Sequence, residues 1–441
     1  MKKTLIYIIT IISLSLILGL LWFIIIKNST DNSNNMPISN NSSNISYSQV
    51  KKITKSQELT NENYASTKAD QNVVLVGNKA KATLSNIKIN KTGDSDGGDS
   101  TSFYGTNSGI LAKDGAKLVI NNATISTKAT GANGVFSYGG SATTDNSTND
   151  GTTVTISNSK ITTTKDNSGG IMTTGGGIMK ANNLTINTQG TSSAAIRSDR
   201  GGGTVTVNKG TYTTTGKGSP AVYSTADITV KNATLVSKAS EGLVIEGKNK
   251  IKIENVKLID TNNTLNGQST TYKNIFIYQS MSGDADNGTA EFSSKNSNII
   301  TNKGDTLYVT NTKAKITLEN NTITNKDKEG NFLRIQKDSW GNSRSNGGNV
   351  TLSLIKQKAK GNIVVDEIST LTMKLTKNSS YQGTINGNKK AKSIKLVLSK
   401  NSKIKLTGDS YVSELEDEDT TYSNIDLNGY KLYVGGKVLN K

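Results

Sequence analysis

The chain lacks the two residue types on which much enzyme chemistry depends: its 441 residues include no cysteine and no histidine. Without histidine there is no Ser-His-Asp triad and no histidine-ligated zinc site, and without cysteine there is no thiol nucleophile. Disulfide bonds are excluded as well, so cysteine usage neither supports nor contradicts export. Asp, Lys and Arg side chains are present, so chemistry that depends on them is not excluded.

Arginine is scarce too, with four copies among 52 basic residues, whereas the many lysines raise the formal net charge to +18. A charge carried mainly by lysine attracts anionic polymers diffusely and lacks the planar forks that bind bases and phosphates bidentately. No nucleic-acid-binding motif is present. We therefore expect an acidic or cell-wall polysaccharide as the partner, and no nucleic acid. The alternative is that the lysines only keep the surface soluble.

A six-residue pattern recurs nine times between residues 84 and 323. It usually consists of an apolar residue, any residue, Asn, two further residues and a second apolar residue. The copies are LSNIKI, INNATI, ISNSKI, ANNLTI, VNKGTY, VKNATL, IENVKL, SKNSNI and LENNTI. Where copies lie closest they are 23 residues apart, as between Asn232 and Asn255. A short recurring period of this kind predicts a solenoid.

Each repeat contains short segments rich in Val, Ile and Thr, separated by Gly, Asn, Asp or Ser. This composition predicts strands, and hence an all-β fold, a parallel β-helix solenoid of about a dozen coils. Equivalent positions of successive coils stack at the strand spacing of about 4.8 Å, so the recurrent Asn is predicted to form a buried structural ladder of side-chain amides. The predicted ladder residues are Asn86, Asn122, Asn158, Asn183, Asn232, Asn255, Asn296 and Asn320.

Residues 4–26 are 23 uncharged residues that follow Lys2 and Lys3. As a helix they would extend about 35 Å, enough to cross a bilayer core of about 30 Å. Because no small-residue cleavage site follows, we expect an uncleaved single-pass signal anchor in the cell membrane, with the bulk of the chain extracellular; a secreted protein with a cleaved signal peptide is the alternative. The predicted organisation is a transmembrane helix at 1–27, an Asn/Ser-rich linker at 28–61, a β-helix at 62–350, and terminal coils with a cap at 351–441.

Three insertions follow the opening strand of their coil, at residues 139–151, 281–288 and 338–349, and the segment RSDRGGG at 197–203 has the same place. Strands must stay short to stack whereas corners can lengthen, so these loops are predicted to lie along one edge. They carry the side chains that bind sugars, because aromatic rings stack on sugar faces and carboxylates hold hydroxyl groups. The predicted ligand-binding residues are Tyr138, Asp145, Asp150, Arg197, Asp199, Arg200, Tyr278, Asp284, Asp286, Trp340 and Arg344.

A further insertion, GDSDGGDSTSFYG at residues 93–105, carries Asp94, Asp96 and Asp99. Closely spaced carboxylates with glycines between them can surround Ca²⁺, although the spacing is not that of an EF-hand. These three residues are therefore a candidate calcium site. A plain acidic loop is the alternative.

The signal segment, the coils of the type GILAKDGAKLVINNATIST at 109–127 and the closing GDSYVSELEDEDTTYSNIDLNGYKLYVGGK at 408–437 resemble the bacterial cell-surface carbohydrate-binding β-helix family of the cellulose- or pectin-binding type. The resemblance covers about residues 62–436 and lies in the texture of the repeats. It implies a right-handed parallel β-helix, non-catalytic binding of polysaccharide, and Ca²⁺ at acidic loops between coils.

The function that we expect is therefore that of an extracellular, surface-anchored polysaccharide-binding protein without catalytic activity. An adhesin-like rod with no defined glycan ligand is one alternative. A calcium-dependent polysaccharide lyase is the other, since Lys and Arg can act as bases. The strands, however, carry mostly Thr, Ser, Asn and Lys, and the facing carboxylates that glycoside hydrolysis requires are not evident.

Overall fold

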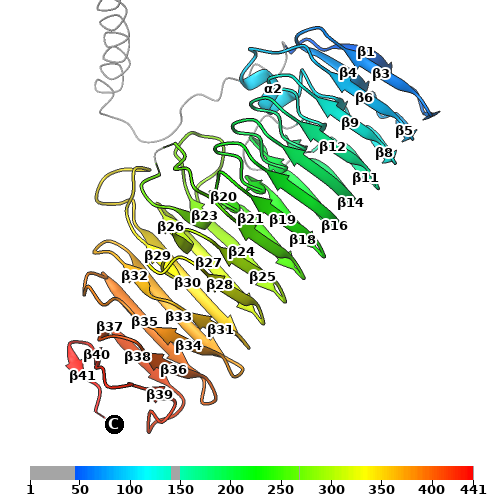
Figure 1. The fold of residues 1–441 in the computed structure, drawn as a ribbon. Coiled ribbons are helices and arrows are strands. Elements are labelled where there is room, and N and C mark those ends of the chain that lie inside the picture. The colour runs from blue at the N-terminus through cyan, green and yellow to red at the C-terminus, as the bar shows by residue number, and fades with distance from the viewer. Residues whose placement is uncertain (1–44, 141–148, 268, 441) are drawn as a thin grey trace, which may run out of the picture. The chain divides into compact units, whose positions relative to one another are not determined.

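The structure, a computed structural model, describes residues 45–140, 149–267 and 269–440. These residues belong to one compact unit, in which the strands stack in chain order from the blue to the red end of Figure 1. Nearly all strand pairs are parallel and join equivalent segments of successive coils, which confirms the predicted all-β fold and the parallel β-helix. The predicted transmembrane helix lies outside the described residues, and within them no helix is long and apolar enough to cross a membrane.

Each complete coil contributes one strand to each of three faces. Face one is a twelve-stranded sheet whose order follows the chain, which agrees with the predicted dozen coils. Its strands are β1 (Ser48–Ile53), β4 (Gln71–Val76), β7 (Ile110–Ala112), β10 (Val135–Tyr138), β13 (Ile171–Thr174), β15 (Ile196–Ser198), β17 (Val222–Ser224), β20 (Leu243–Glu246), β23 (Lys273–Tyr278), β26 (Asp305–Thr310), β29 (Leu333–Ile335) and β32 (Ile363–Val365).

Faces two and three belong to a second large sheet of 22 strands, which bends at the corner between them. Face two consists of β2 (Gln57–Thr60), β5 (Lys81–Ser85), β8 (Lys117–Asn121), β11 (Thr153–Ser157), β14 (Gly177–Thr188), β16 (Gly203–Thr214), β18 (Asp227–Lys231), β21 (Lys250–Glu254), β24 (Thr289–Lys295), β27 (Thr312–Glu319), β30 (Gly348–Ile355), β33 (Thr370–Thr376), β35 (Ser393–Leu398) and β38 (Glu414–Asp417). The long strands β14 and β16 continue through the corner onto face three.

The remaining strands complete face three and the C-terminal end. Face three consists of β3 (Asn63–Ser66), β6 (Lys88–Lys91), β9 (Thr124–Thr127), β12 (Lys160–Thr163), β19 (Thr234–Ser237), β22 (Lys257–Asp260), β25 (Asn298–Thr301) and β28 (Thr322–Asn325), followed by the four-stranded sheet β31 (Lys358–Lys360), β34 (Ser380–Gly383), β36 (Lys403–Leu406) and β39 (Ile425–Asp426). A three-stranded sheet of β37 (Ser410–Val412), β40 (Leu432–Val434) and β41 (Lys437–Val438) ends the described chain.

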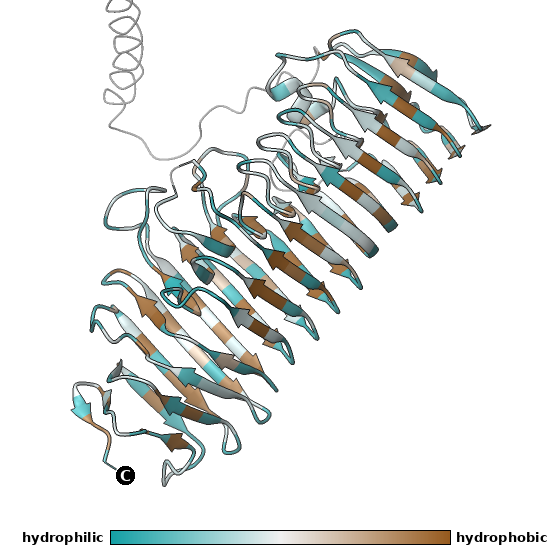
Figure 2. Ribbon diagram, viewed as in Figure 1, coloured by the Kyte–Doolittle hydropathy of each residue, from teal (hydrophilic) through white to brown (hydrophobic). Residues whose placement is uncertain are grey.

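The core lies inside the coils because side chains alternate along each strand. In β8, Leu118 and Ile120 are buried whereas Lys117 and Val119 are exposed. Figure 2 shows the same apolar positions recurring from strand to strand. The pairing places Ile120 beside Ile156, so the interior is a set of aliphatic columns that run through successive coils.

The recurrent Asn lies at the corner between faces two and three, and the prediction that it is buried was wrong. All eight predicted ladder residues are exposed, and all have φ between 50° and 55°. Lys209, which replaces Asn in one copy, has φ 63°. This left-handed conformation costs most residues roughly 1–2 kcal/mol, and Asn adopts it more readily because its short polar side chain can bond locally. The corner therefore selects Asn for its backbone conformation.

Some of the recurrent Asn side chains nevertheless stack on those of the next coil. Hydrogen bonds of 2.8 to 3.1 Å from Nδ2 to Oδ1 join Asn183 to Asn158, Asn255 to Asn232, and Asn320 to Asn296. Where the copy has Lys209, the neighbouring Asn208 supplies the missing amide, since it accepts from Asn232 at 2.8 Å and donates to Asn182 at 3.0 Å. The ladder is thus a surface feature of the corner.

A different buried ladder, made of serines, was not predicted. The Ser168 hydroxyl accepts from the Ala132 backbone N–H at 2.9 Å, Ser193 accepts from Ser168 at 2.9 Å, and Ser219 accepts from Ser193 at 2.8 Å. All three serines have 0% exposure. They satisfy backbone donors at the corner before face one, where buried polar groups would otherwise lack partners.

Two predicted domain boundaries were also wrong. The linker was expected at 28–61, but β1 and β2 lie within it. These strands have few apolar residues and only Ile53 is fully buried, so their sequences give a weak strand signal. The boundary at residue 350 falls inside β30, which pairs in register with β27 and β33. The β-helix therefore continues without interruption beyond that point.

Candidate functional site

Two adjoining pockets lie on the outer side of face one, in the middle of the coil series. The first has a volume of about 250 Å³ and is lined by Arg197, Asp199 and Asp284, so we call it the arginine pocket. The second has a volume of about 270 Å³ and is lined by Phe276, Tyr278 and Trp340, and we call it the aromatic pocket. Gly218, Pro220 and Tyr223 line both, so the two pockets form one continuous recess.

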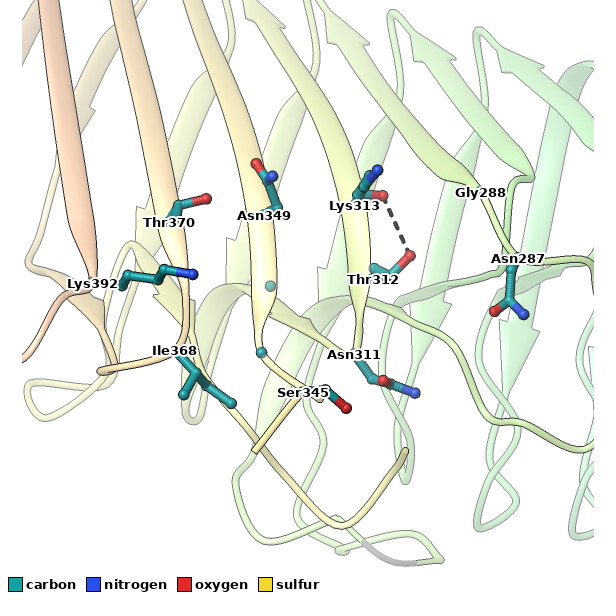
Figure 3. A pocket seen from close by; sticks show the side chains of 12 residues that line it. Asn287, Gly288, Asn311, Thr312, Lys313, Ser345, Asn349, Ile368, Thr370 and Lys392 are labelled. Carbon is teal, nitrogen blue, oxygen red and sulfur yellow. Dashed lines mark hydrogen bonds between the residues drawn. The ribbon is translucent and has the colours of Figure 1, made fainter. Parts of the chain in front are cut away.

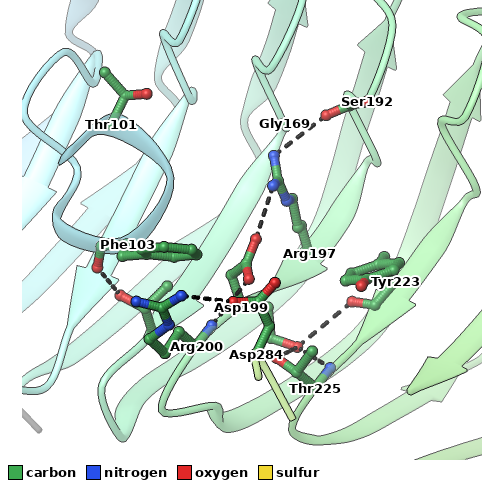
Figure 4. Close-up of polar contacts among 12 residues, drawn as sticks. Thr101, Phe103, Gly169, Ser192, Arg197, Asp199, Arg200, Tyr223, Thr225 and Asp284 are labelled. Carbon is green, nitrogen blue, oxygen red and sulfur yellow. Dashed lines mark hydrogen bonds and ion pairs between the residues drawn. The ribbon is translucent and has the colours of Figure 1, made fainter. Parts of the chain in front are cut away.

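The arginine pocket is built from the end of β15 and the turn that follows it (Figure 4). Arg197 Nη2 donates to Asp199 Oδ2 at 2.8 Å, and its Nη1 donates to the Ser192 carbonyl at 3.2 Å. Burial raises the pKa of Asp199, and the Arg197 guanidinium opposes that rise. The pairing leaves the pocket with both donors and acceptors and little net charge.

Arg200 joins two insertions that are distant in sequence. Its Nη2 donates to Asp284 Oδ1 at 2.9 Å, and its guanidinium lies 4.1 Å from the ring centroid of Phe103. Phe103 belongs to α2 (Asp99–Tyr104), which is anchored by a 2.6 Å hydrogen bond from the Thr174 hydroxyl to the Phe103 carbonyl. Figure 4 shows Arg200 between this helix and Asp284. The insertions thus support one another over face one.

Stacked rings form one wall of the aromatic pocket. Phe276 and Tyr278 stack with centroids 4.4 Å apart, and the partly exposed Trp340 packs against both, at 5.2 Å and 5.3 Å. Phe276 also meets Tyr308 at 5.8 Å. Aromatic walls with a few polar groups are typical of ligand sites, and a partly exposed indole can stack on an apolar ligand face.

The buried carboxylate of Glu246 fixes the tyrosines of the recess. It accepts hydrogen bonds from the hydroxyls of Tyr223, Tyr278 and Ser280, with 3.1 Å from Tyr278. Burial raises the pKa of Glu246, and it raises the pKa of Tyr223 and Tyr278 well above the usual range. The tyrosine hydroxyls therefore stay protonated and serve as donors that hold the rings in place.

Lys273 lies behind the aromatic wall with 0% side-chain exposure. Its Nζ is 4.3 Å from the Phe276 centroid, 4.8 Å from that of Tyr308 and 5.6 Å from that of Trp340. Glu241 Oε1 lies 3.8 Å away, and burial lowers the pKa of the amine. Cation–π attraction holds the three rings around the amine, so Lys273 positions the wall and does not face the pocket.

Six of the predicted ligand-binding residues are brought together: Arg197, Asp199, Arg200, Asp284, Tyr278 and Trp340. Tyr138 is not among them. It is 7% exposed, in a separate cluster with Phe136 and Met172, and its ring meets Tyr104 edge-on at 5.6 Å. Its prediction as an exposed ligand residue was wrong, because Tyr104 of α2, within the insertion at residues 93–105, packs against it.

The remaining predicted ligand residues do not line the recess as the structure describes it. Asp150 Oδ1 accepts from the Thr152 backbone at 2.8 Å and closes a turn, and Asp286 pairs with Lys248 at 2.8 Å. Arg344 is exposed with φ 72°. Asp145 lies outside the described residues.

The three aspartates of the predicted calcium loop are not gathered around one point. Asp94 pairs with Lys165 at 2.6 Å and accepts from the Thr130 backbone at 2.7 Å, while Asp96 and the helix residue Asp99 are exposed. Within the described ranges, no group of three or more acidic side chains is arranged to hold a metal ion. The calcium site stays a prediction without geometric support.

Sequence reasoning missed the residues that build the walls of the recess: Tyr223, Glu241, Glu246, Lys273, Phe276 and Tyr308. A signal for some of them was present. In the middle of face one, an outward-facing residue directly follows a buried aliphatic residue of each strand, and the pairing aligns Arg197, Tyr223, Val244, Phe276 and Tyr308 in this position on consecutive strands. Following this outward column from coil to coil would have located the aromatic wall.

Comparison with known proteins gives no relative from which a function could be transferred. No family model, no curated protein and no solved structure matches this chain. Its function therefore has to be inferred from the recess itself.

Proposed function

We propose that this chain is a non-catalytic polysaccharide-binding protein whose binding site is the recess on face one. The observation that carries the proposal is the continuity of the two pockets: partly exposed rings at Tyr223 and Trp340 stand beside the paired charges of Arg197, Asp199 and Asp284. Sugars present both an apolar ring face and a rim of hydroxyls that donate and accept, and this recess offers a partner for each.

The direction of the recess also favours a polymer over a small metabolite. The recess follows the outward column of face one, along which strands are spaced by about 4.8 Å, so a linear chain lying across the coils would meet a new side chain at each step. Extended binding of this kind suits a polysaccharide. The N-terminal anchor, the extracellular location and the right-handed winding belong to the same proposal, and they are supported by the sequence and by the usual handedness of parallel crossovers.

Binding without catalysis is favoured over lyase chemistry because Lys273 is inaccessible behind the aromatic wall and Arg197 is already paired with Asp199. Lys273 has 0% side-chain exposure and its Nζ faces three rings and Glu241. A lyase base must reach the substrate proton within hydrogen-bond distance. Calcium stabilisation through Asp94, Asp96 and Asp99 is part of the same proposal. Its expected result is that a chelator lowers the melting temperature of the parent chain but not that of Asp96→Asn.

The test is a polysaccharide-binding screen of the full chain, followed by dissociation constants for the parent, Trp340→Ala and the control Tyr272→Ala. Tyr272 is a partly exposed ring that packs under Lys303 and lines neither pocket. Loss of a central aromatic anchor should weaken binding by about 1–3 kcal/mol, while Tyr272→Ala leaves it unchanged. Ring stacking should survive about 0.5 M salt, which screens diffuse attraction to the lysines.

Product analysis and melting curves complete the experiment. No new reducing ends and no ultraviolet-absorbing unsaturated product should appear, and both variants should unfold in a cooperative transition like that of the parent, which shows that they are folded. Binding that disappears in salt and ignores Trp340 would refute the sugar-binding recess. An absence of binding to every glycan in the screen would leave the adhesin-like rod as the better description.

A further inference from the structure

A third pocket, separate from the recess, lies where the chain passes from face one to face two. It has a volume of about 510 Å³ and lies at the starts of β27, β30 and β33. Figure 3 shows Lys313, Asn349 and Thr370 on neighbouring strands along its wall, with Lys392 reaching in from the next coil. We call it the polar pocket because amides, hydroxyls and amines make up most of its lining.

The polar pocket carries uncompensated positive charge. No Asp or Glu is among the residues that line it, and within the described part of the chain neither Lys313 nor Lys392 has a carboxylate within ion-pair distance. Several other lysines of face two are paired across coils, as in Lys295 with Glu319 at 3.0 Å and Lys231 with Glu254 at 3.0 Å. The two exposed amines therefore stay available to a ligand, and attraction to an anion there is opposed by no neighbouring acid of the lining.

The side chains of the wall are arranged as a regular row. Lys313 pairs in register with Asn349, and Asn349 pairs with Thr370, so an amine, an amide and a hydroxyl face outward on three successive strands about 4.8 Å apart. Lys392 immediately precedes Ser393, the residue in register with Thr370 on the fourth strand. Such a row presents hydrogen-bonding groups to a linear ligand and an amine at each end.

One loop separates the polar pocket from the aromatic pocket. Trp340 lines the aromatic pocket, whereas Ser345 of the same loop lines the polar pocket. The amide of Asn346 holds the loop closed, since its Nδ2 donates to the carbonyls of Asp338 at 2.6 Å and Trp340 at 2.9 Å. A single structured insertion thus contributes residues to the lining of both pockets.

We propose that the polar pocket is a second polysaccharide subsite that binds the carboxylates of uronate-type sugar units. The inference rests on the proposed function and deepens it by naming the ligand class. Lys313 and Lys392 pair with the carboxylates, while Asn349 and Thr370 bond the ring hydroxyls. The arginine pocket does not supply this charge recognition, because Arg197 and Arg200 are already paired with Asp199 and Asp284.

The experiment measures binding of tetragalacturonate and its methyl ester to the full chain and to Lys313→Gln/Lys392→Gln. The acid should bind at least tenfold more weakly to the variant, and the ester should bind equally to both proteins. The control is Lys315→Gln/Lys374→Gln, which removes two exposed lysines, one from β27 and one from β33, that do not line the polar pocket. This control should retain parent affinity for the acid.

Each outcome separates the subsite from the recess. Equal affinity of the acid for the parent and the pocket variant would overturn the subsite, as would competition by an oligoglutamate of the same charge as strong as that by tetragalacturonate. If ester binding is then lost in Trp340→Ala but unaffected by the lysine changes, the recess alone would be supported as a binding site. Acid binding that is lost in the lysine variant and unaffected in Trp340→Ala would support the polar pocket and refute the recess.

Discussion

Arg200 donates a 2.9 Å hydrogen bond to Asp284, a residue 84 positions further along the chain. The pair joins the turn after β15 to the insertion after β23, and about one quarter of each side chain is exposed. Arg200 also packs on Phe103, so three insertions meet at one guanidinium. The outer wall of the arginine pocket depends on these contacts between loops, since none of the three belongs to a long strand.

The first prediction concerns this contact. A double-mutant cycle with Arg200→Ala and Asp284→Ala should give a coupling free energy of unfolding of about 1 kcal/mol, because the pair is only partly exposed and hydrogen-bonded. Arg200→Ala should cost more than Asp284→Ala, since it also removes the packing on Phe103. Urea unfolding of the four proteins provides the measurement. Strict additivity of the two single changes would show that the loops are held together by other contacts.

The second prediction concerns the corner at Asn158. Because its φ is 50°, Asn158→Val should destabilise the fold by about 1–2 kcal/mol, whereas Asn158→Gly should be close to neutral. Asn158→Gly also removes the amide that accepts from Asn183, so the comparison separates backbone conformation from side-chain bonding. Thermal melting of the two variants checks this. If Gly were as harmful as Val, the amide ladder would be the dominant contribution.

The third prediction is a pH dependence that originates at Asp260. Burial raises the pKa of this carboxyl to about 8, and Oδ1 accepts from the Asn262 backbone while Oδ2 has no partner among the described residues. Between about pH 4 and pH 8 the folded state keeps a proton that the unfolded state has lost. Stability therefore falls as the pH rises through that window, by up to about 1.4 kcal/mol per pH unit.

Replacing Asp260 by Asn should remove this dependence, because the amide keeps the acceptor and cannot ionise. Asp260→Asn should accordingly be more stable than the parent at pH 7.5 and nearly equal to it at pH 4.5, as measured by urea unfolding. Asp227→Asn, an exposed change on β18, serves as the control. Parallel stability curves for the parent and Asp260→Asn would show that Asp260 is ionised in the folded chain.

The sequence was sufficient to predict the parallel β-helix because the fold repeats the same coil of short strands many times. Residues such as Ile125, Ile161 and Ile186 recur at equivalent places, and the structure pairs them in adjacent strands. The recurrent Asn marks the corner between faces two and three. Its exposure was not predictable from the spacing, because a residue selected for positive φ and one selected for a buried ladder give the same periodic pattern.

The grouping of Arg197, Asp199, Arg200 and Asp284 was predictable in outline, since insertions at one corner of a stacked fold must lie along one edge. The burial of Tyr138 and the position of Lys273 behind the aromatic wall were not predictable. Tyr138 is covered by a short helix from another coil, and Lys273 is enclosed by rings from β23, β26 and the loop of Trp340. The sequence by itself determined which residues repeat, and hence the coils, their corners and their core. Only the tertiary structure decided which loops fold back over face one. Those contacts join insertions of irregular length, and their packing depends on shape and charge, so it produces no periodic pattern in the sequence.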